Sequence, residues 1–204
     1  MNNLNLKALV PAAEADRRSR QAATRLEAAA ADRDLLDVAT ATVPSPIGDL
    51  LVAVTSRGLV RVAFDDENRD DVLEDLAARL SPRILDSARA TENVRRELQE
   101  YFERERTRFD IRIDWRLMGA FAKQVLAATS RVPFGRTTTY GELAERIGHP
   151  RAARAVGTAL GSNPIPVIVP CHRVLRAGGA LGGYGGGLPR KELLLELEGV
   201  HLPA

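Results

Sequence analysis

The sequence predicts an α+β fold: a small antiparallel sheet with helices, followed by a mostly helical C-terminal half that holds a helix-turn-helix and a lone cysteine. Three observations support this. Short β-branched runs separated by Gly- and Pro-containing turns lie before residue 65, helical periodicity dominates after residue 118, and Cys171 is the one cysteine among 204 residues. A chain of this length can bury a real core as one large domain or two small ones.

We divide the chain into three segments. Residues 1–37 are rich in Ala, Arg, Asp and Glu and contain no glycine, so we expect an N-terminal extension that is either helical or disordered. Residues 38–114 are expected to form a small α+β domain. Residues 115–204 are expected to form a separate C-terminal domain.

The first domain begins with three strand-like runs, at residues 38–43, 50–55 and 59–64, that predict an antiparallel meander because turn residues separate them. Apolar spacing then predicts helices over about 69–80 and 92–106. Residues 109–113 alternate between apolar and polar and predict a further strand.

The C-terminal half has the layout of a helix-turn-helix. A helix is predicted over 121–130. Thr139 and Glu142 have the spacing of a capping box, which predicts a helix from this point to Ile147. The turn Gly148-His149-Pro150 follows, and then a second helix over 151–161.

The second helix of this pair has two different faces. The i, i+3, i+4 pattern predicts one buried face: Ala152, Ala155, Val156, Ala159 and Leu160. The opposite face has one long cation among small residues: Arg154, Gly157, Thr158 and Gly161. Such a face can approach a nucleic-acid groove closely, although an ordinary amphipathic helix fits the spacing equally well.

Charge and cysteine usage narrow the function classes. The net charge is +2, but from Leu117 onward 10 Lys and Arg stand against 5 Asp and Glu, which favours a polyanionic partner for this half. The chain has no run of about eighteen apolar residues and no secretory signal pattern, so no membrane partner is expected. A lone thiol is typical of a reducing compartment, so we expect a cytoplasmic protein. One cysteine and three histidines argue against a metal site.

Cys171 follows an apolar, β-branched run at residues 164–170, which predicts a buried extended segment. His172 and Arg173 come next, so we expect the chain to leave the core at the thiol and a nearby cation to lower the thiol pKa. Seven of the ten residues 178–187 are glycine, and such a loop can wrap a flat ligand.

A last helix is predicted from Pro189 through Glu198, ended by Gly199. A carboxylate in a last turn is disfavoured by the helix dipole, which suggests that Glu198 has a partner. Cys171, His172 and Glu198 together make a plausible nucleophile, base and orienting group. In extended backbone His172 would point away from the thiol, and a bridging water or a local bend would be needed to connect them. These residues alone fit a cysteine hydrolase as well as a transferase.

The C-terminal half resembles the O6-alkylguanine-DNA alkyltransferases, the suicidal DNA repair proteins. The resemblance rests on Pro-Cys-His-Arg-Val at 170–174, on Asn163-Pro164 before it, and on further motifs on both sides: Tyr140-Gly141-Glu142-Leu143-Ala144, Arg151 through Gly157, Tyr184, Gly186-Gly187-Leu188, Lys191-Glu192 and Glu198-Gly199. It implies a ribonuclease-H-like N-terminal domain and a C-terminal DNA-binding and alkyl-acceptor domain. It also implies a single-turnover methylated-DNA–protein-cysteine methyltransferase that needs no cofactor and uses base flipping.

The resemblance also implies roles for single residues. Cys171 would accept the alkyl group as a thioether, with His172 as a base acting through a water and Glu198 orienting it. Asn163 would brace the turn between the recognition helix and the active-site strand. Arg154 would enter the duplex and fill the gap left by the flipped nucleotide, which must leave the stack before its alkyl group can be reached.

Further roles follow around the base. Gly157 and Thr158 would lie against DNA beside Arg154. Tyr140 would crowd the adjacent phosphate and donate toward guanine N3. The substrate contacts would come from the carbonyls of Cys171 and Val174, from Tyr184 and from the backbone N–H of Gly185.

The expected partner is double-stranded DNA with O6-alkylguanine, bound by a monomer; activity on O4-alkylthymine and cooperative binding are left open. Gly185 stands where many relatives have serine, Gly161-Ser162 where some have an arginine, and the N-terminal zinc-binding cysteines of some relatives are absent. The main alternative is a non-catalytic alkyltransferase-like lesion-binding protein. That group lacks the cysteine, so Cys171 argues against it. A helix-turn-helix regulator would explain neither Cys171 nor the glycine-rich loop.

Overall fold

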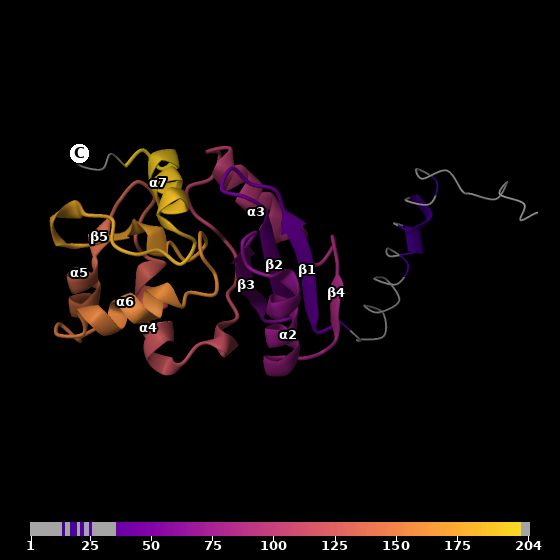
Figure 1. Cartoon of the computed structure of the whole chain (residues 1–204), viewed down its shortest axis with the longest axis horizontal. Coiled ribbons are helices and arrows are strands. Elements are labelled where there is room, and N and C mark those ends of the chain that lie inside the picture. Colours follow the sequence, from indigo (N-terminus) through magenta and orange to yellow (C-terminus); the bar gives the residue numbers. More distant parts are fainter. Residues whose placement is uncertain (1–13, 15–16, 20, 23–24, 26–35, 201–204) are drawn as a thin grey trace, which may run out of the picture.

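The computed structural model describes residues 14, 17–19, 21–22, 25 and 36–200. The predicted N-terminal extension, residues 1–37, therefore lies mostly outside the described residues. From Val38 onward the chain forms a sheet with its helices and then a mostly helical C-terminal part, which lie side by side in Figure 1. This is the α+β fold that the sequence predicts.

The sheet has four strands in the order β3-β2-β1-β4. Strands β1 (Val38–Val43), β2 (Leu50–Thr55) and β3 (Gly58–Phe64) form the predicted antiparallel meander. The fourth strand, β4 (Ile84–Asp86), pairs in parallel with β1 and was not predicted. Three residues are too few to show a period of two.

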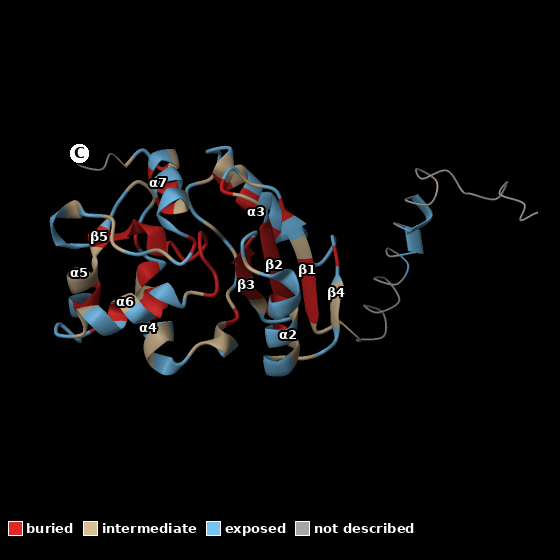
Figure 2. Ribbon diagram, in the orientation of Figure 1, coloured by how far each residue is buried: buried red, intermediate tan, exposed pale blue. Residues whose placement is uncertain are grey.

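Strands β2 and β3, which are red in Figure 2, are buried on both faces, as is most of β1, whereas β4 at the edge has no buried residue. Side chains such as Leu51 and Val60 point to one face, which α2 (Arg69–Arg79) covers with Val72 and Leu76. Their neighbours in sequence point to the other face, toward the C-terminal part and α3 (Glu92–Phe102). Helix α3 ends four residues earlier than predicted. The two predicted domains therefore share one cluster of buried side chains.

The strand predicted at 109–113 is wrong. These residues contain no strand, and only Ile113 forms an isolated parallel bridge, with Leu59 of β3. The backbone of Leu59 donates to Arg112 and accepts from Asp114, both at 2.8 Å. Apolar and polar residues alternate over 109–113 because side chains such as Phe109 and Ile111 pack onto the core from a connecting segment. Such packing needs no ladder of strand hydrogen bonds.

The C-terminal part contains α4 (Ala120–Thr129), α5 (Tyr140–Arg146), α6 (Ala153–Gly161) and α7 (Leu188–Leu197). Thr139 and Glu142 form the predicted capping box at the start of α5. Two short strands, β5 (Thr138–Thr139) and β6 (Val174–Leu175), pair in parallel. Among the described helices, none combines the length and hydropathy that a membrane crossing requires.

Helix α6 has the two faces that its sequence predicts, with two exceptions. Val156, Ala159 and Leu160 are buried, and Arg154 and Thr158 are exposed. Of the residues predicted to be buried, Ala155 is exposed and Ala152, the N-cap, is half-buried. A nine-residue helix packed on α4 and α5 buries a stripe narrower than the one we assumed.

The segment before the cysteine is buried, as predicted, but it is not extended. Residues 164–170 form successive turns, and Val167 has φ of +72°, a left-handed conformation that β-branched residues rarely adopt. The chain then enters a 3₁₀ turn, Cys171–Arg173, rather than a strand. His172 and Arg173 are buried, so the prediction that the chain leaves the core at the thiol is also wrong.

Candidate active site

The thiol of Cys171 is held in place by Asn163, which follows the end of α6. The side-chain amide of Asn163 donates to the Cys171 Sγ at 3.1 Å and to the Val169 carbonyl at 2.9 Å. Its Oδ1 accepts from the Ile165 backbone at 3.0 Å. Asn163 thus closes the turned segment between α6 and the cysteine, which is the bracing geometry expected of it.

The prediction that the pKa of Cys171 is lowered is wrong. Burial raises the pKa of the thiol to about 11, and the Asn163 hydrogen bond and the charge of Lys191 oppose this only in part. Arg173, two residues after the cysteine, donates instead to Glu198. The resting group is a protonated thiol, and it needs a base before it can act as a nucleophile.

Glu198, at the end of α7, is the centre of a buried network. It accepts from His172 Nε2 at 2.9 Å and from Arg173 through Nε and Nη2, both at 2.8 Å. The Tyr101 hydroxyl and the Gly135 backbone donate to it as well, at 2.7 and 3.2 Å. Glu198 is 5 % exposed. The sequence predicted a partner for the Glu198 carboxylate, and the structure provides four such groups.

The protonation states in this network follow from its contacts. Burial raises the pKa of Glu198, but the hydrogen bonds from His172 and Arg173 outweigh it and lower the pKa to about 2. Burial lowers the pKa of His172 in spite of the nearby carboxylate. A neutral His172 must keep its proton on Nε2, because that nitrogen faces the ionised Glu198. Its Nδ1 is then a free acceptor, and this buried atom has no hydrogen-bond partner in the described structure.

A cavity of about 620 Å³ opens onto the thiol. It brings together Cys171, Tyr140 and Arg154 with Tyr184 and Gly185 of the glycine-rich loop. The other lining residues are Ala153, Gly157, Leu160, Gly161, Arg176 and Gly183. Residues from three parts of the C-terminal half thus meet at one hollow, whose volume is typical of small-ligand sites.

The thiol also borders a second cavity, of about 310 Å³, on the side of the sheet. Val62 and Phe64 of β3 line it together with Pro166 and Gly186. Strand β3 docks here directly, because the Val62 backbone donates to the Pro164 carbonyl at 2.8 Å. The surroundings of the thiol therefore include side chains of the N-terminal part.

Two tyrosines flank the first cavity. Tyr140 is half-buried, and its hydroxyl lies 3.5 Å from the Gly183 carbonyl. The Tyr184 hydroxyl is buried without a partner in the described structure, and its ring meets the His172 ring edge-on at 6.4 Å. Burial raises the pKa of both phenols, so both are protonated donors at neutral pH.

The two carbonyls expected to face a base already have partners. The Cys171 carbonyl accepts from the Val174 backbone, and the Val174 carbonyl accepts from Lys191 Nζ at 2.7 Å. A carbonyl oxygen has two lone pairs, so each can accept once more. Lys191 also donates to the Leu181 carbonyl and, at 3.4 Å, to that of Gly183. Burial lowers the pKa of this lysine to about 8.

The outer face of α6 is open. The Arg154 side chain is exposed and makes no hydrogen bond or ion pair to any described residue. Thr158 donates only to the Arg154 carbonyl, one turn earlier, at 3.3 Å. Gly157 lies against the Tyr140 ring, where an added Cβ would come within 3.7 Å. An exposed cation with no partner among the described residues thus lines the thiol cavity.

Two family models match the chain. The ribonuclease-like domain of 6-O-methylguanine DNA methyltransferase matches residues 38–115, and the DNA-binding domain of the same family matches residues 120–200. The chain belongs to the 6-O-methylguanine DNA methyltransferase family. Both the fold class and the resemblance drawn from the sequence are thereby confirmed.

Relatives within this family cover most of the chain. A methylated-DNA–protein-cysteine methyltransferase of Mycolicibacterium paratuberculosis is 46% identical over 171 residues, which are 80% of this chain and 93% of the relative. One of Methanosarcina acetivorans is 41% identical over 76% of this chain and 94% of its own length. A crystal structure of the Mycobacterium tuberculosis O6-methylguanine methyltransferase gives a TM-score of 0.69 at 40% identity, over 82% of this chain and 96% of that one. The structure of that protein in complex with DNA gives 0.68 at 40% identity, over 80% and 92%.

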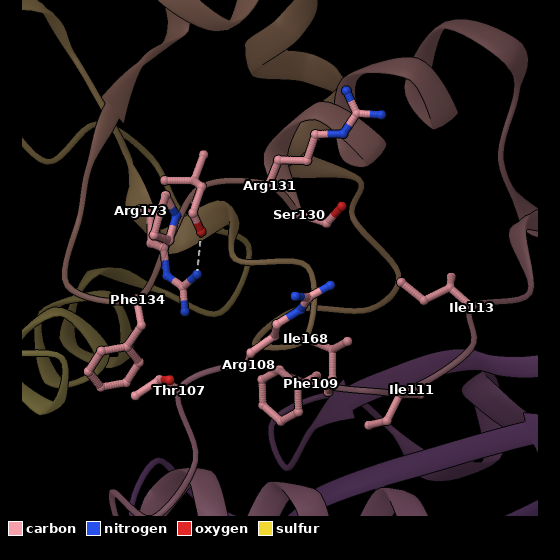
Figure 3. A pocket seen from close by; sticks show the side chains of 12 residues that line it. Thr107, Arg108, Phe109, Ile111, Ile113, Ser130, Arg131, Phe134, Ile168 and Arg173 are labelled. Carbon is pink, nitrogen blue, oxygen red and sulfur yellow. Dashed lines mark hydrogen bonds between the residues drawn. The ribbon is translucent and has the colours of Figure 1, made fainter.

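The methyltransferase fold also encloses a larger cavity, of about 770 Å³, away from the thiol. It lies between the connecting segment 107–113 and the turn after α4. Figure 3 shows Arg108 and Arg173 extending among apolar side chains there. None of the predicted site residues lines it. Arg173 separates this hollow from Glu198, so the larger cavity lies behind the buried network.

Three residues of this family member reach the site without having been predicted to do so. Arg173 and Lys191 stand inside the motifs that carry the resemblance, but nothing in their local pattern shows which carbonyl or carboxylate they contact. Tyr101 lies 97 residues before Glu198. It is a buried residue of α3, and no local signal could have revealed its hydroxyl contact.

Proposed function

We propose that this protein repairs DNA by transferring the alkyl group of O6-alkylguanine to Cys171. The observation that supports this best is that Cys171 lines the same cavity as the exposed Arg154 of α6. A nucleophile beneath a helix-turn-helix, with an unpartnered imidazole nitrogen on the next residue, fits group transfer from a nucleic-acid base. Double-stranded DNA is the partner.

The transfer step balances within the residues of the site. The Cys171 Sγ forms a bond to the alkyl carbon as the bond from that carbon to guanine O6 breaks. The thiol proton passes through a water to His172 Nδ1, since the Nε2 proton is held by Glu198. The electron pair of the broken bond enters the guanine ring, and Tyr140 donates a proton there. Solvent returns a proton from His172 to Tyr140.

The base must leave the stack first, because the reacting carbon lies inside the duplex. Arg154 enters the gap, and Gly157 and Thr158 let the helix approach the groove. Tyr140 stands beside them and crowds the phosphate. The flipped base is then held by the Cys171 and Val174 carbonyls, by Tyr184 and by the backbone N–H of Gly185.

The product is a thioether, which water does not readily cleave, so each molecule acts once. We place the protein in the cytoplasm as a monomer. The resting thiol pKa of about 11 agrees with this scheme, since the nucleophile is generated only when a base and substrate are in place.

The test is to incubate the protein with duplex DNA containing O6-methylguanine and to measure the mass of the peptide that contains Cys171. One added methyl group is expected, with an equimolar loss of the lesion. The Cys171→Ala variant should bind the same DNA and gain no mass. Binding by the unaltered protein without any added methyl group would instead support the lesion-binding alternative.

A further inference from the structure

The side chain of Arg190, in the first turn of α7, joins the two parts of the molecule. Its Nε donates to the Ile47 carbonyl at 2.9 Å, and its Nη1 contacts Asp66 at 3.0 Å. Its Nη2 pairs with Asp65. These three partners belong to the N-terminal part, whereas the Gly186 carbonyl, 2.8 Å from Nη1, belongs to the glycine-rich loop. One guanidinium therefore ties the end of β3 to the loop beside the thiol.

The ring of Phe64, the last residue of β3, completes this junction. The Arg190 guanidinium lies over the ring at 4.8 Å from its centroid. The ring meets Tyr184 edge-on at 6.0 Å. It also lies so close to Gly186 that an added Cβ there would come within 2.5 Å of the ring. We call Phe64, Asp65, Asp66, Gly186 and Arg190 the interdomain latch.

The latch acts on the segment that would face the substrate. Tyr184 and Gly185 line the cavity that opens onto Cys171, and Gly186 follows them directly. Glycine-rich backbone does not hold its own position, because each glycine has many conformations available to it. Contacts outside the loop must therefore fix it, and on this side those contacts come from β3 and Arg190.

We propose that Arg190 is a positioning residue for alkyl transfer: it uses the N-terminal part to hold Tyr184 and Gly185 in place over Cys171. This rests on the proposed function. Its consequence is that the N-terminal part, which holds none of the residues that touch the base, still determines the geometry of the base pocket.

The shape of the arginine side chain is what suits it to this position. Asp65 and Asp66 are 46 and 63 % exposed, so simple charge attraction to them is weak. The planar fork of the guanidinium can reach two carboxylates and two carbonyls at once and still cover an aromatic ring. Lysine keeps the charge but has a single nitrogen, so Arg190→Lys should behave nearly as Arg190→Ala does.

The test compares two reactions of Cys171 in the full-length chain. One is benzyl transfer from free O6-benzylguanine, which needs the base pocket. The other is alkylation by iodoacetamide, which needs only an accessible thiol. In Arg190→Ala the benzyl-transfer rate should fall about tenfold, since a displacement of about 1 Å can cost up to ~100-fold. The iodoacetamide rate should stay equal or rise, because the loosened loop covers the thiol less.

A matched control is Arg95→Ala, which removes an exposed arginine of α3 with no side-chain contact to any described residue. It should leave both rates unchanged. A loss of benzyl transfer in Arg190→Ala that equals its unfolded fraction, measured by circular dichroism, would show a merely structural role and overturn the proposal. The iodoacetamide rate would then rise in proportion to that fraction, because unfolding removes the burial that keeps the thiol protonated. A benzyl-transfer rate equal to that of the unaltered protein would overturn the proposal as well. Absence of benzyl transfer in the unaltered protein would instead contradict the proposed function.

A second pair of variants tests the loop contact without touching Arg190. Gly186→Ala should slow benzyl transfer, because the added Cβ collides with the Phe64 ring, whereas the φ of Gly186 itself suits alanine. Adding Phe64→Leu removes the ring atoms concerned and should restore part of the rate. If the double variant is as slow as Gly186→Ala alone, the Phe64 contact does not set the position of the loop.

Discussion

The two sides of Cys171 differ in how their polar groups are satisfied. On one side Glu198 accepts five hydrogen bonds from four groups in a buried network that leaves a single histidine nitrogen free. On the other side α6 presents an exposed arginine with no partner among the described residues. The fold thus provides hydrogen-bond partners for the groups that prepare the reaction, and it leaves the groups that would meet DNA without partners. Variants on the first side should alter stability, and variants on the second should alter recognition.

The largest effect is expected on the buried side. Glu198→Ala leaves the Arg173 guanidinium buried without its anion, so the free energy of unfolding should fall by about 3–5 kcal/mol. Urea-induced unfolding measures this. Glu192→Ala removes an exposed carboxylate from the same helix and should change the free energy by no more than about 0.5 kcal/mol. Similar losses in the two variants would contradict the contrast between the sides.

Acid should weaken the same network. The Glu198 pKa is lowered to about 2 from 4.5, so its contribution to stability is complete above about pH 4.5 and is lost as the pH falls toward 2. At 1.36 kcal/mol per pKa unit it amounts to about 3 kcal/mol. Urea unfolding of the native chain should therefore depend on pH between 5 and 2 more steeply than that of Glu198→Gln. Equal slopes would show that other carboxylates dominate.

The reactivity of the Cys171 thiol, which lies between the two sides, tests whether burial keeps the thiol protonated. Because burial raises the Cys171 pKa to about 11 from 9.0, the thiolate fraction at pH 8 should be about a hundredfold lower than in the unfolded chain. The rate of alkylation by iodoacetamide should keep rising beyond pH 9 in the folded protein and level off near pH 9 in urea. A plateau at pH 9 in both states would mean that the thiol is not held protonated by burial.

A smaller effect is expected on the open side. Arg154→Ala should slow repair of duplex DNA about tenfold or more, because the unstacking cost of a few kcal/mol loses its compensation. Benzyl transfer from the free base should not change, since no duplex has to be opened. Equal losses with duplex and free base would contradict the flipping role.

Gly157→Ala should give the smallest effect. Its one added methyl group should change stability and DNA affinity in opposite directions. Its Cβ would make an ordinary contact with Tyr140 at 3.7 Å, so α6 should gain helix propensity and the unfolding free energy should rise by up to about 1 kcal/mol. Affinity for duplex DNA should fall, because the same methyl group would stand on the side of α6 that we propose faces the groove. Thermal unfolding and a DNA titration measure the two. Unchanged affinity would show that this face does not enter the groove closely.

Local patterns predicted the elements that local forces determine. The meander, the capping box of Thr139 and Glu142, and the faces of α6 follow from turn chemistry and periodicity. The segment at 164–170 was misjudged because β-branched residues normally extend, whereas here the Asn163 contacts close it into turns and Val167 adopts a positive φ.

The chemistry of the site could be predicted only in part. The pairing of Glu198 was foreseen from the helix dipole, and its place beside His172 from the resemblance. The direction of the Cys171 pKa shift was not, because it depends on how deeply the thiol is buried and on Arg173 turning toward Glu198. The Tyr101 contact depends on the docking of two parts far apart in sequence, which no local pattern encodes.

The burial of Cys171 has a consequence for how long the protein remains usable. A protein that reacts once must keep its thiol intact until a lesion arrives. Oxidation by peroxide follows thiolate character and exposure. Cys171 is 6 % exposed and protonated at neutral pH, so it is shielded on both counts. The feature that makes the thiol a poor nucleophile at rest also preserves it, and each molecule keeps its single equivalent for an alkylated base.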